Sequence, residues 1–230
     1  MTSAGELGER YRRAPCVFFD CDGVIFDSNG FKIEAMRRTL DGHQPSQVAQ
    51  MEDFWRSNGG VSRFVKFEHF FTHIAPQADV QGHMRAACAR FGALSRAAYD
   101  EKEPLPQALR LARATGAERC HVVSGAAQSE LVSVFAAKNI GGLFASILGS
   151  PRTKLELCQG VLAERRCPPS DAILIGDGAM DFRVCRELGI HFVYLEQFSE
   201  WAGAEAALAG AAGVSIASRW DDLLALLLER

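Results

Sequence analysis

The sequence predicts an α/β fold built on a parallel sheet, with a block of helices inserted after the first strand. Strand-like and helix-like segments alternate after Pro104, which is typical of a parallel sheet with helices on both faces. A single buried strand is predicted earlier, over Cys16–Phe19, and residues 29–100 show helical patterns without a comparable strand. We therefore expect a core domain of residues 1–28 and 101–230, and an all-helical domain of residues 29–100.

The bulk composition is that of an ordinary globular protein. The chain has 230 residues, 48% hydrophobic and 23% charged, which is enough for a large core plus a smaller domain. Its formal net charge of -3 excludes a general basic field for nucleic acid. Met1–Ala14 lacks the apolar centre of a signal peptide, and no apolar run approaches the length of a membrane span. We expect no nucleic-acid or membrane partner, and a monomer or homodimer.

The cysteine pattern indicates a reducing compartment. Seven cysteines are present, an odd number, and no two have the Cys-x-x-Cys spacing. Several fall in apolar strand-like segments, where cysteine packs as a small hydrophobic residue. A reduced cytoplasmic protein is therefore favoured over a disulfide framework or a zinc site.

The segments of the core follow one another in a regular order. Each short apolar run that predicts a buried strand is followed by a segment with helical spacing. The predicted strands cover residues 16–19, 120–123, 145–148, 172–175 and 191–195, and the predicted helices cover 107–115, 128–138, 154–165, 180–188 and 220–228. Ala202–Ala212 is rich in Ala and Gly and is compatible with either a helix or a loose surface segment.

The inserted block begins with an amphipathic helix. Apolar residues recur at helical spacing over residues 30–40, with basic residues between them. The later helical segments are interrupted at Asn58-Gly59-Gly60 and at Ala75-Pro76. The block is rich in aromatic residues, which we interpret as its own hydrophobic core rather than as a binding site.

The most informative stretch follows the first strand, where Asp20 and Asp22 precede Gly23. A strand that ends in Asp-x-Asp-Gly places two carboxylates at the carboxyl edge of a sheet, where open α/β folds bind ligands. Such carboxylates can hold a divalent cation and present a nucleophile to a phosphate. The alternative is that both are turn residues, because Asp and Gly are common in turns.

Two further signals follow later strands. Ser124-Gly125 ends the strand predicted over 120–123, and a hydroxyl with exposed backbone amides can bind phosphate oxygens there. A helix N-cap is the alternative for Ser124. Lys154 opens a helix after the next strand and can neutralise both a carboxylate and a phosphoryl group, with Arg152 as a rival for that role.

The last signal is Gly176-Asp177-Gly178, with Asp181 one helical turn later. Magnesium takes one or two protein carboxylates, so Asp177 fits a metal ligand and Asp181 fits a supporting residue or an occasional ligand. Helix capping by Asp177 and a surface position for Asp181 are the alternatives. Each signal alone has an ordinary structural explanation, but four of them in this order at strand ends are not expected by chance.

The four signals resemble the four motifs of the haloacid dehalogenase-like hydrolase superfamily, in the same order and over nearly the whole chain. The stretch from Asp22 to Ser28 is similar to the first motif of its phosphoglycolate phosphatase and β-phosphoglucomutase branch. The resemblance implies a Rossmann-like three-layer α/β/α core with a parallel sheet and an inserted all-helical cap. The chain would enter the cap at Asp27 and Ser28 and return near Tyr99–Pro104.

The resemblance also implies catalytic and substrate-binding roles. Asp20 would be the nucleophile that forms an aspartyl-phosphate, and Asp22 would be the general acid and base. Ser124, Gly125 and neighbouring backbone amides would bind the phosphoryl oxygens. Lys154 would stabilise the charge between Asp20 and the phosphate.

A metal site is implied by the same resemblance. Mg²⁺ would be held by Asp20, the backbone carbonyl of Asp22, and Asp177, with Asp181 behind them. True dehalogenases of this superfamily lack the second aspartate of the first motif. Its presence here as Asp22 favours phosphate over carbon–halogen substrates.

The loop from Asn58 to Arg63 is similar to a cap loop of β-phosphoglucomutase-like proteins, where a Gly-x-Ser-Arg segment faces the active site. The resemblance implies that Arg63 binds substrate, because a guanidinium can fork onto an anionic or hydroxylated group. A helix–helix turn with a surface arginine is the alternative. Lys66, one turn on, and His69 are further candidates.

These expectations lead to a Mg²⁺-dependent phosphatase of a small phosphorylated metabolite, because a closed cap admits only small molecules. Phosphoglycolate, hexose phosphates and nonulosonate-type sugar phosphates all remain open. One alternative is a β-phosphoglucomutase-like phosphosugar mutase, whose second phosphate pocket Arg63 and Lys66 would supply. The other is a non-catalytic phosphometabolite-binding protein, against which the complete set of motif residues argues.

Overall fold

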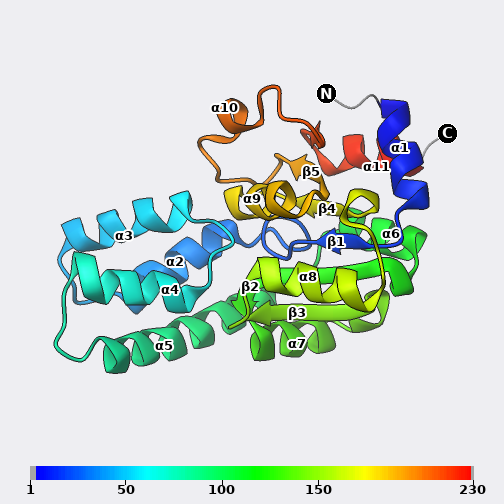
Figure 1. Ribbon diagram of the computed structural model, residues 1–230. Helices are drawn as coiled ribbons and strands as arrows, with labels where there is room; N and C mark the ends of the chain where they lie inside the picture. The colour runs from blue at the N-terminus through cyan, green and yellow to red at the C-terminus, as the bar shows by residue number, and fades with distance from the viewer. Residues whose placement is uncertain (1–3, 229–230) are drawn as a thin grey trace.

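Six parallel strands form one sheet in the computed structural model, which describes residues 4–228 (Figure 1). The strands lie in the order β3-β2-β1-β4-β5-β6. Their bounds are β1 Val17–Phe19, β2 Cys120–Ala127, β3 Ser146–Ser150, β4 Ile173–Gly176, β5 His191–Leu195 and β6 Val214–Ala217. The predicted α/β fold with a parallel sheet is confirmed. Residues 1–3 and 229–230 of the predicted core domain lie outside the described residues.

The helices of the core form the two outer layers of a three-layer arrangement. One face of the sheet is covered by α1 Ala4–Arg13, α6 Pro106–Thr115, α7 Gln128–Ala137 and α11 Trp220–Leu228, and the other by α8 Lys154–Glu164, α9 Ala179–Leu188 and α10 Ala204–Leu208. Short 3-10 turns occur at Ala117–Arg119, Gly141–Leu143 and Pro169–Asp171. Within residues 4–228, none of the helices combines the length and apolar character needed to cross a membrane.

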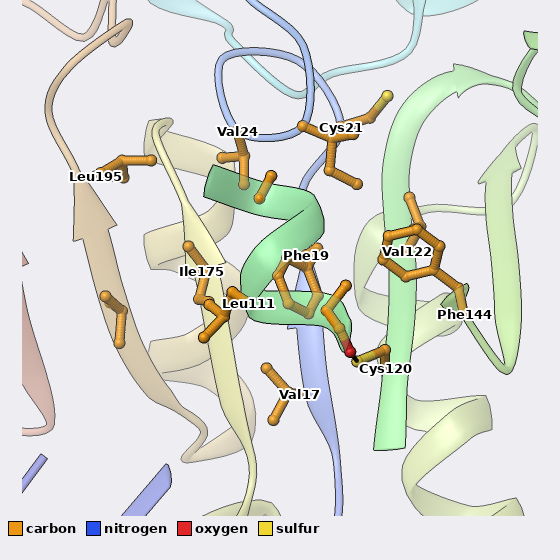
Figure 2. Packing of buried hydrophobic residues seen from close by; sticks show 14 of the residues in the cluster. Val17, Phe19, Cys21, Val24, Leu111, Cys120, Val122, Phe144, Ile175 and Leu195 are labelled. Atoms are coloured by element: carbon orange, nitrogen blue, oxygen red, sulfur yellow. Dashed lines mark hydrogen bonds between the residues drawn. The ribbon is translucent and has the colours of Figure 1, made fainter. Parts of the chain in front are cut away.

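The central strand β1 is buried on both faces, which explains its continuous apolar sequence. Phe18 packs into the hydrophobic cluster on one face, and Val17 and Phe19 pack into the cluster on the other. Figure 2 shows Phe19 between Val122 and Ile175 of the neighbouring strands. Full burial of one such side chain stabilises the fold by about 1.5–3 kcal/mol.

The strand register brings the expected site residues to one edge of the sheet. Phe19 lies opposite Val122 of β2 and Ile175 of β4. The backbone N–H of Asp20 donates to the carbonyl of Ile175 at 2.9 Å, so the pairing continues one residue beyond β1. The residues that follow Phe19, Val122 and Ile175 therefore lie side by side.

The inserted block is helical, as predicted, and we call residues 29–100 the cap. It contains α2 Asn29–Thr39, α3 Pro45–Ser57, α4 Arg63–His69, a π-helical turn Phe70–Ile74 and most of α5 Val80–Glu101. These helices lie together beyond the sheet in Figure 1 and share a separate hydrophobic cluster that includes Trp55, Phe67 and Phe91. Phe67 is therefore confirmed as a residue of the cap core, whereas Trp55 and Phe91 belong to this core and also line a cavity against the core domain.

Three elements differ from the sequence prediction. β2 continues through Ala127, although the apolar run ends at Val123. The strand β6 and the helix α1 were not expected. β6 is only four residues long at the sheet edge, and one of its residues, Ile216, is 41% exposed. Ala202–Ala212 contains the short helix α10 within otherwise irregular chain.

Candidate active site

Asp20 stands at the centre of the site, immediately after β1. It is 4% exposed, and its carboxylate is fixed from two sides. The backbone N–H of Cys21 donates to Asp20 Oδ1 at 2.7 Å, and Lys154 Nζ lies 3.0 Å from Asp20 Oδ2. One carboxylate oxygen is thereby held by the backbone and the other by a cation, which fixes the direction of the side chain.

Gly23 explains why a glycine follows the two aspartates. Its φ is +76°, a conformation that L side chains rarely adopt. A Cβ at this position would also lie 2.1 Å from Asp177 Oδ2. The turn after β1 therefore has to be closed by glycine if Asp177 is to approach Asp20.

Asp177 and Asp181 complete a cluster of three buried carboxylates. One oxygen each of Asp20, Asp177 and Asp181 lies within 4.8 Å of the others. Asp177 Oδ2 accepts from the side-chain amide of Asn29 at 2.8 Å. Asp181 stands in the first turn of α9, where the backbone N–H of Gly178 donates to its Oδ2 at 3.1 Å. The surface position considered for Asp181 is excluded, because this residue is fully buried.

Lys154 is the cation of this cluster. Its ammonium lies 3.0 Å from Asp20 Oδ2 and 2.5 Å from Asp181 Oδ1, and its side chain is 1% exposed. Thr153 caps α8 by accepting a hydrogen bond from the backbone N–H of Glu156. This cap fixes the start of the helix at Lys154. Arg152, the rival candidate, is exposed and donates to the carbonyl of Glu156 instead.

The electrostatics of the cluster favour an additional cation. Burial, followed by the charge of Asp181, raises the pKa of Asp20 to about 7, although Lys154 opposes this shift. Burial and the charges of Asp20 and Asp181 raise the pKa of Asp177 well above its ordinary value. Burial alone would lower the pKa of Lys154, but Asp181 and Asp20 raise it overall. Three carboxylates and one ammonium leave an excess of negative charge that fits a divalent cation with oxygen ligands.

Ser124 and Gly125 lie at the same edge, within β2. Ser124 is 1% exposed and lines the same cavity as Asp20 and Asp177. Its hydroxyl accepts from the backbone N–H of Ala126 at 3.1 Å. Ser124 does not cap a helix, because α7 begins only at Gln128. The structure therefore places its hydroxyl beside the carboxylates rather than at a helix end.

Asp22 has a different environment from Asp20. Its carboxylate accepts hydrogen bonds from Ser28 Oγ at 2.5 Å and from the hydroxyl of Tyr99, and it forms an ion pair with Lys32. Burial alone would raise the pKa of Asp22, but Lys32, Ser28 and Tyr99 lower it overall. Asp22 is therefore held as a carboxylate at the point where the chain enters and leaves the cap.

Sequence reasoning missed Lys32 and Tyr99, which contact Asp22, and Asn29, which donates to Asp177. Lys32 was seen only as one of the basic residues of an amphipathic helix, and Tyr99 only as the end of the cap. The contact of Tyr99 with Asp22 joins residues 77 positions apart in the chain, which no local spacing reveals, whereas Lys32 lies only 10 positions from Asp22. The one available signal was that Lys32 lies one helical turn after Ser28.

The cap loop closes over this edge of the sheet. A cavity between cap and core is lined by Trp55, Gly60 and Val61 from the cap and by Asp20 and Ser124 from the core. The contact is tight, since a Cβ on Gly125 would lie 2.3 Å from the carbonyl oxygen of Gly60. The predicted position of this loop over the site is thus what the structure shows.

Arg63 lines the cavity from the first turn of α4. It is not a surface residue, because it is 5% exposed and its guanidinium lies 2.5 Å from Glu130 on α7 of the core. Contact between Arg63 and a substrate stays a prediction. Lys66 also lines the cavity, whereas His69 does not and stacks on Phe54 at 3.8 Å between ring centres.

Comparison with known proteins identifies the family. The family model of haloacid dehalogenase-like hydrolases matches residues 14–189, most of the 230-residue chain. No protein of curated function matches the sequence. The chain therefore belongs to the haloacid dehalogenase-like hydrolase family, and its enzyme class is hydrolase.

Solved structures share the complete fold. A haloacid dehalogenase-like hydrolase from Streptococcus pneumoniae is 20% identical, with a TM-score of 0.69 over 93% of this chain and 98% of that one. A predicted phosphoglycolate phosphatase from Haemophilus somnus is 15% identical, with a TM-score of 0.68 over 92% and 97%. CbbY from Rhodobacter sphaeroides, in complex with xylulose-1,5-bisphosphate, is 18% identical, with a TM-score of 0.66 over 93% and 99%. At these identities the likeness establishes the fold, including the helical cap.

Proposed function

We propose that this hydrolase is a Mg²⁺-dependent phosphatase that removes phosphate from a small phosphorylated metabolite through an aspartyl-phosphate on Asp20. The observation that carries the proposal is the convergence of Asp20, Lys154 and Asp177 in one buried cluster beneath a closed cap loop. Membership of the family supports hydrolysis, and the named neighbours include phosphatases. The presence of Asp22 favours phosphate esters over carbon–halogen substrates.

Two aspartates, Asp20 and Asp22, would carry out the two steps of the reaction. Asp20 attacks phosphorus with one carboxylate oxygen while the bond to the leaving oxygen breaks, and Asp22 gives its proton to that oxygen. Asp22 then takes a proton from the water that attacks the phosphoryl group, which frees phosphate and restores the Asp20 carboxylate. Asp22 is ionised in the structure, which is the form required for this second step. The proton that Asp22 gives to the leaving oxygen in the first step has to come with the substrate, because the monoanion of a phosphate monoester carries one.

The remaining polar groups neutralise charge and hold the phosphate. Lys154 already contacts Asp20, so it reduces the repulsion between the nucleophile and an anionic phosphate. Ser124 and the backbone amide of Gly125, which lie in β2 next to β1, would bind the phosphoryl oxygens. These interactions matter because phosphoryl transfer depends mainly on positioning and electrostatic stabilisation.

The residues present fit a magnesium site. Asp20, Asp177 and the backbone carbonyl of Asp22 would hold the ion, and Asp181, already bound to Lys154 and to a backbone amide, would support them. When bound, Mg²⁺ would neutralise the excess carboxylate charge and polarise the phosphate. Burial, and then the repulsion between the neighbouring carboxylates, raises the pKa of Asp20 and of Asp177, and a bound cation would relieve this repulsion.

We also propose the domain division 1–28 and 101–230 for the core and 29–100 for the cap. The cap excludes water and limits the substrate to a small molecule, such as a sugar phosphate or a phosphoglycolate-like compound. The seven free, buried cysteines support a cytoplasmic location. The absence of a nucleic-acid or membrane partner, and a monomeric or homodimeric state, stay predictions.

The proposal is tested by phosphate release from a broad panel of phosphorylated metabolites, with Mg²⁺ and with EDTA. Asp20→Asn is the catalytic blank, and Asp41→Asn, an exposed cap residue, is the matched control. We expect metal-dependent release that Asp20→Asn abolishes and Asp41→Asn leaves unchanged. Release that persists in Asp20→Asn would contradict the mechanism. Isomerisation of a sugar phosphate in the presence of a bisphosphate primer, without release of free phosphate, would instead establish the mutase.

A further inference from the structure

The cations that line the cavity differ in whether they already have a carboxylate partner. Three of them form ion pairs: Lys32 with Asp22, Arg56 with Glu200 at 2.6 Å, and Arg63 with Glu130 at 2.5 Å. Lys66 is the fourth. Within the part of the chain that the structure describes, it forms no ion pair with any carboxylate.

Lys66 is buried in spite of this missing partner. The residue is 4% exposed, and its ammonium donates to the carbonyl of Trp55 at 3.3 Å. The ammonium also lies 4.3 Å from the centre of the Trp55 ring, a cation–π contact. An ammonium has three donors, and these contacts satisfy one of them with a neutral acceptor.

This environment is unfavourable for the charged form of Lys66. Burial, and then the charge of Lys32, lowers the pKa of Lys66 to about 7, although Asp22 and Glu200 oppose the shift. Buried cations are normally paired, since removing an ammonium from water is costly. Lys66 therefore lacks the compensation that the other cavity cations have, and its position on the cavity wall shows where an anion would supply it.

We propose that Lys66 binds a second anionic group of the substrate, a carboxylate or a second phosphate, distinct from the phosphate that is transferred at Asp20. The inference rests on the proposed phosphatase function and narrows its substrate class. Asp20 and Ser124 hold one end of the substrate at the core, and Lys66 holds the other end at the cap wall. Trp55 and Phe91, which also line the cavity, provide apolar contact between the two ends.

Arg63 is less suited to this role. Its guanidinium is bound to Glu130, and its charge also lies 4.6 Å from the ring centre of Phe91. Glu130 neutralises Arg63 from the core side and links the cap to α7. A second anion on Arg63 would have to compete with this buried carboxylate, whereas Lys66 has no anionic competitor in the described residues.

The experiment compares matched phosphate esters that differ in the second charge. The pairs are 2-phosphoglycolate with ethyl phosphate, 3-phosphoglycerate with glycerol 3-phosphate, and fructose 1,6-bisphosphate with fructose 6-phosphate. The first two pairs test a carboxylate, and the third tests a second phosphate. We expect wild-type kcat/KM to favour the doubly anionic member of at least one pair by about 10- to 100-fold, as charge-assisted hydrogen bonds do.

Three variants assign that preference to Lys66. Lys66→Met should lose about 10- to 100-fold on the preferred compound, mainly through KM, and less than about twofold on the partner compound that lacks the second anionic group. Lys66→Arg should keep most of the preference, because it keeps the charge. Lys102→Met, at an exposed lysine whose side chain is 47% accessible, should change neither activity.

Thermal unfolding separates a substrate-binding role from a structural one. Lys66→Met should raise Tm, because it replaces an uncompensated buried charge with an apolar chain of similar length. A lower Tm with equal activity losses on both members of a pair would overturn the inference, as would a wild-type preference below twofold in every pair. Release from no compound, or equal release by Asp20→Asn, would overturn the proposed phosphatase itself.

Discussion

The two walls of the cavity treat buried charge in different ways. On the core side, Lys154 lies within 3.0 Å of both Asp20 and Asp181, so each of these charges has an oppositely charged partner before any ligand binds, although the cluster keeps an excess of negative charge. On the cap wall, Lys66 has only a backbone carbonyl and an aromatic ring. The comparison suggests that the core wall is organised for chemistry common to many phosphate esters, whereas the cap wall keeps a charge available for one kind of substrate.

This difference follows from how each wall is built. Asp20 and Asp177 directly follow β1 and β4, and Ser124 lies in β2, so the register of the sheet brings these three residues together. Lys154 and Asp181 join them from the first turns of α8 and α9. The cap residues are carried by helices whose partners are distant in sequence, such as Glu130 for Arg63. A change on the core wall should therefore affect every substrate, and a change on the cap wall should affect some substrates more than others.

The largest loss of activity among the tests of the two walls is expected from a substitution at Asp22. Asp22→Asn should lower kcat by about 10²–10⁴-fold, because the general acid and base is lost while Lys32 and Ser28 can still hold the amide. The loss should be greater for alkyl phosphates than for p-nitrophenyl phosphate, whose leaving group needs no proton. Phosphate release by the purified variant on both compounds measures this, with Asp41→Asn as the control.

Equal losses on both leaving groups would contradict the acid role of Asp22 and leave it only a role in positioning. A loss confined to doubly anionic substrates would contradict the comparison of the two walls, because a core-wall residue would then select between substrates. Circular dichroism and Tm of Asp22→Asn are needed beside the kinetics, since three hydrogen-bonding partners surround the side chain.

The core wall was predictable from the sequence because its signals are local. Asp20, Ser124 and Asp177 each follow a short apolar run, and parallel pairing places such positions together without further information. Lys154 was favoured over Arg152 by the resemblance to the family, since both stand near the start of α8, and the structure places Lys154 against Asp20. The fold was predictable for the same reason, except for β6, whose four residues at the sheet edge give a weak strand signal.

The cap wall was not predictable in the same detail. Arg63 and Lys66 both stand on α4, three residues apart, and the resemblance of the cap loop favoured Arg63 as the substrate-binding residue. Their difference comes from Glu130, which lies 67 positions from Arg63 and reaches it across the cap–core boundary. The contact of Tyr99 with Asp22 likewise depends on the packing of α5 against the start of the core.

An intermediate loss of activity is expected when the contact between the cap loop and β2 is opened. Gly125→Ala should lower kcat/KM by about 10- to 100-fold, because its Cβ would lie 2.3 Å from Gly60 O and would push the cap loop away. Gly59→Ala is the matched control in the loop, since a Cβ there meets nothing within 4 Å. The expected order is a large loss for Gly125→Ala on all substrates and a small one for Gly59→Ala. Equal effects would contradict a closed cap as the active form.

The smallest effect is on stability and concerns the uncompensated charge of Lys66. Its pKa is about 7 in the folded protein against an ordinary value of 10.5, so between these values the unfolded chain binds more protons than the folded one. The free energy of unfolding should therefore rise with pH across this window, and the penalty from Lys66 should be complete below pH 7.

Lys66→Met removes that dependence. Urea unfolding at pH 6 should show the variant more stable than wild type by about 1 kcal/mol, the scale of an unsatisfied buried polar group. The gap should shrink as pH approaches 10, and Lys102→Met, carrying an exposed substitution, should show no such trend. A gap that is constant with pH, or a variant less stable at pH 6, would mean that contacts within the protein already compensate Lys66. The contrast between the paired charges of the core wall and the unpaired charge of Lys66 would then fail, because the charge of Lys66 would also be compensated without substrate.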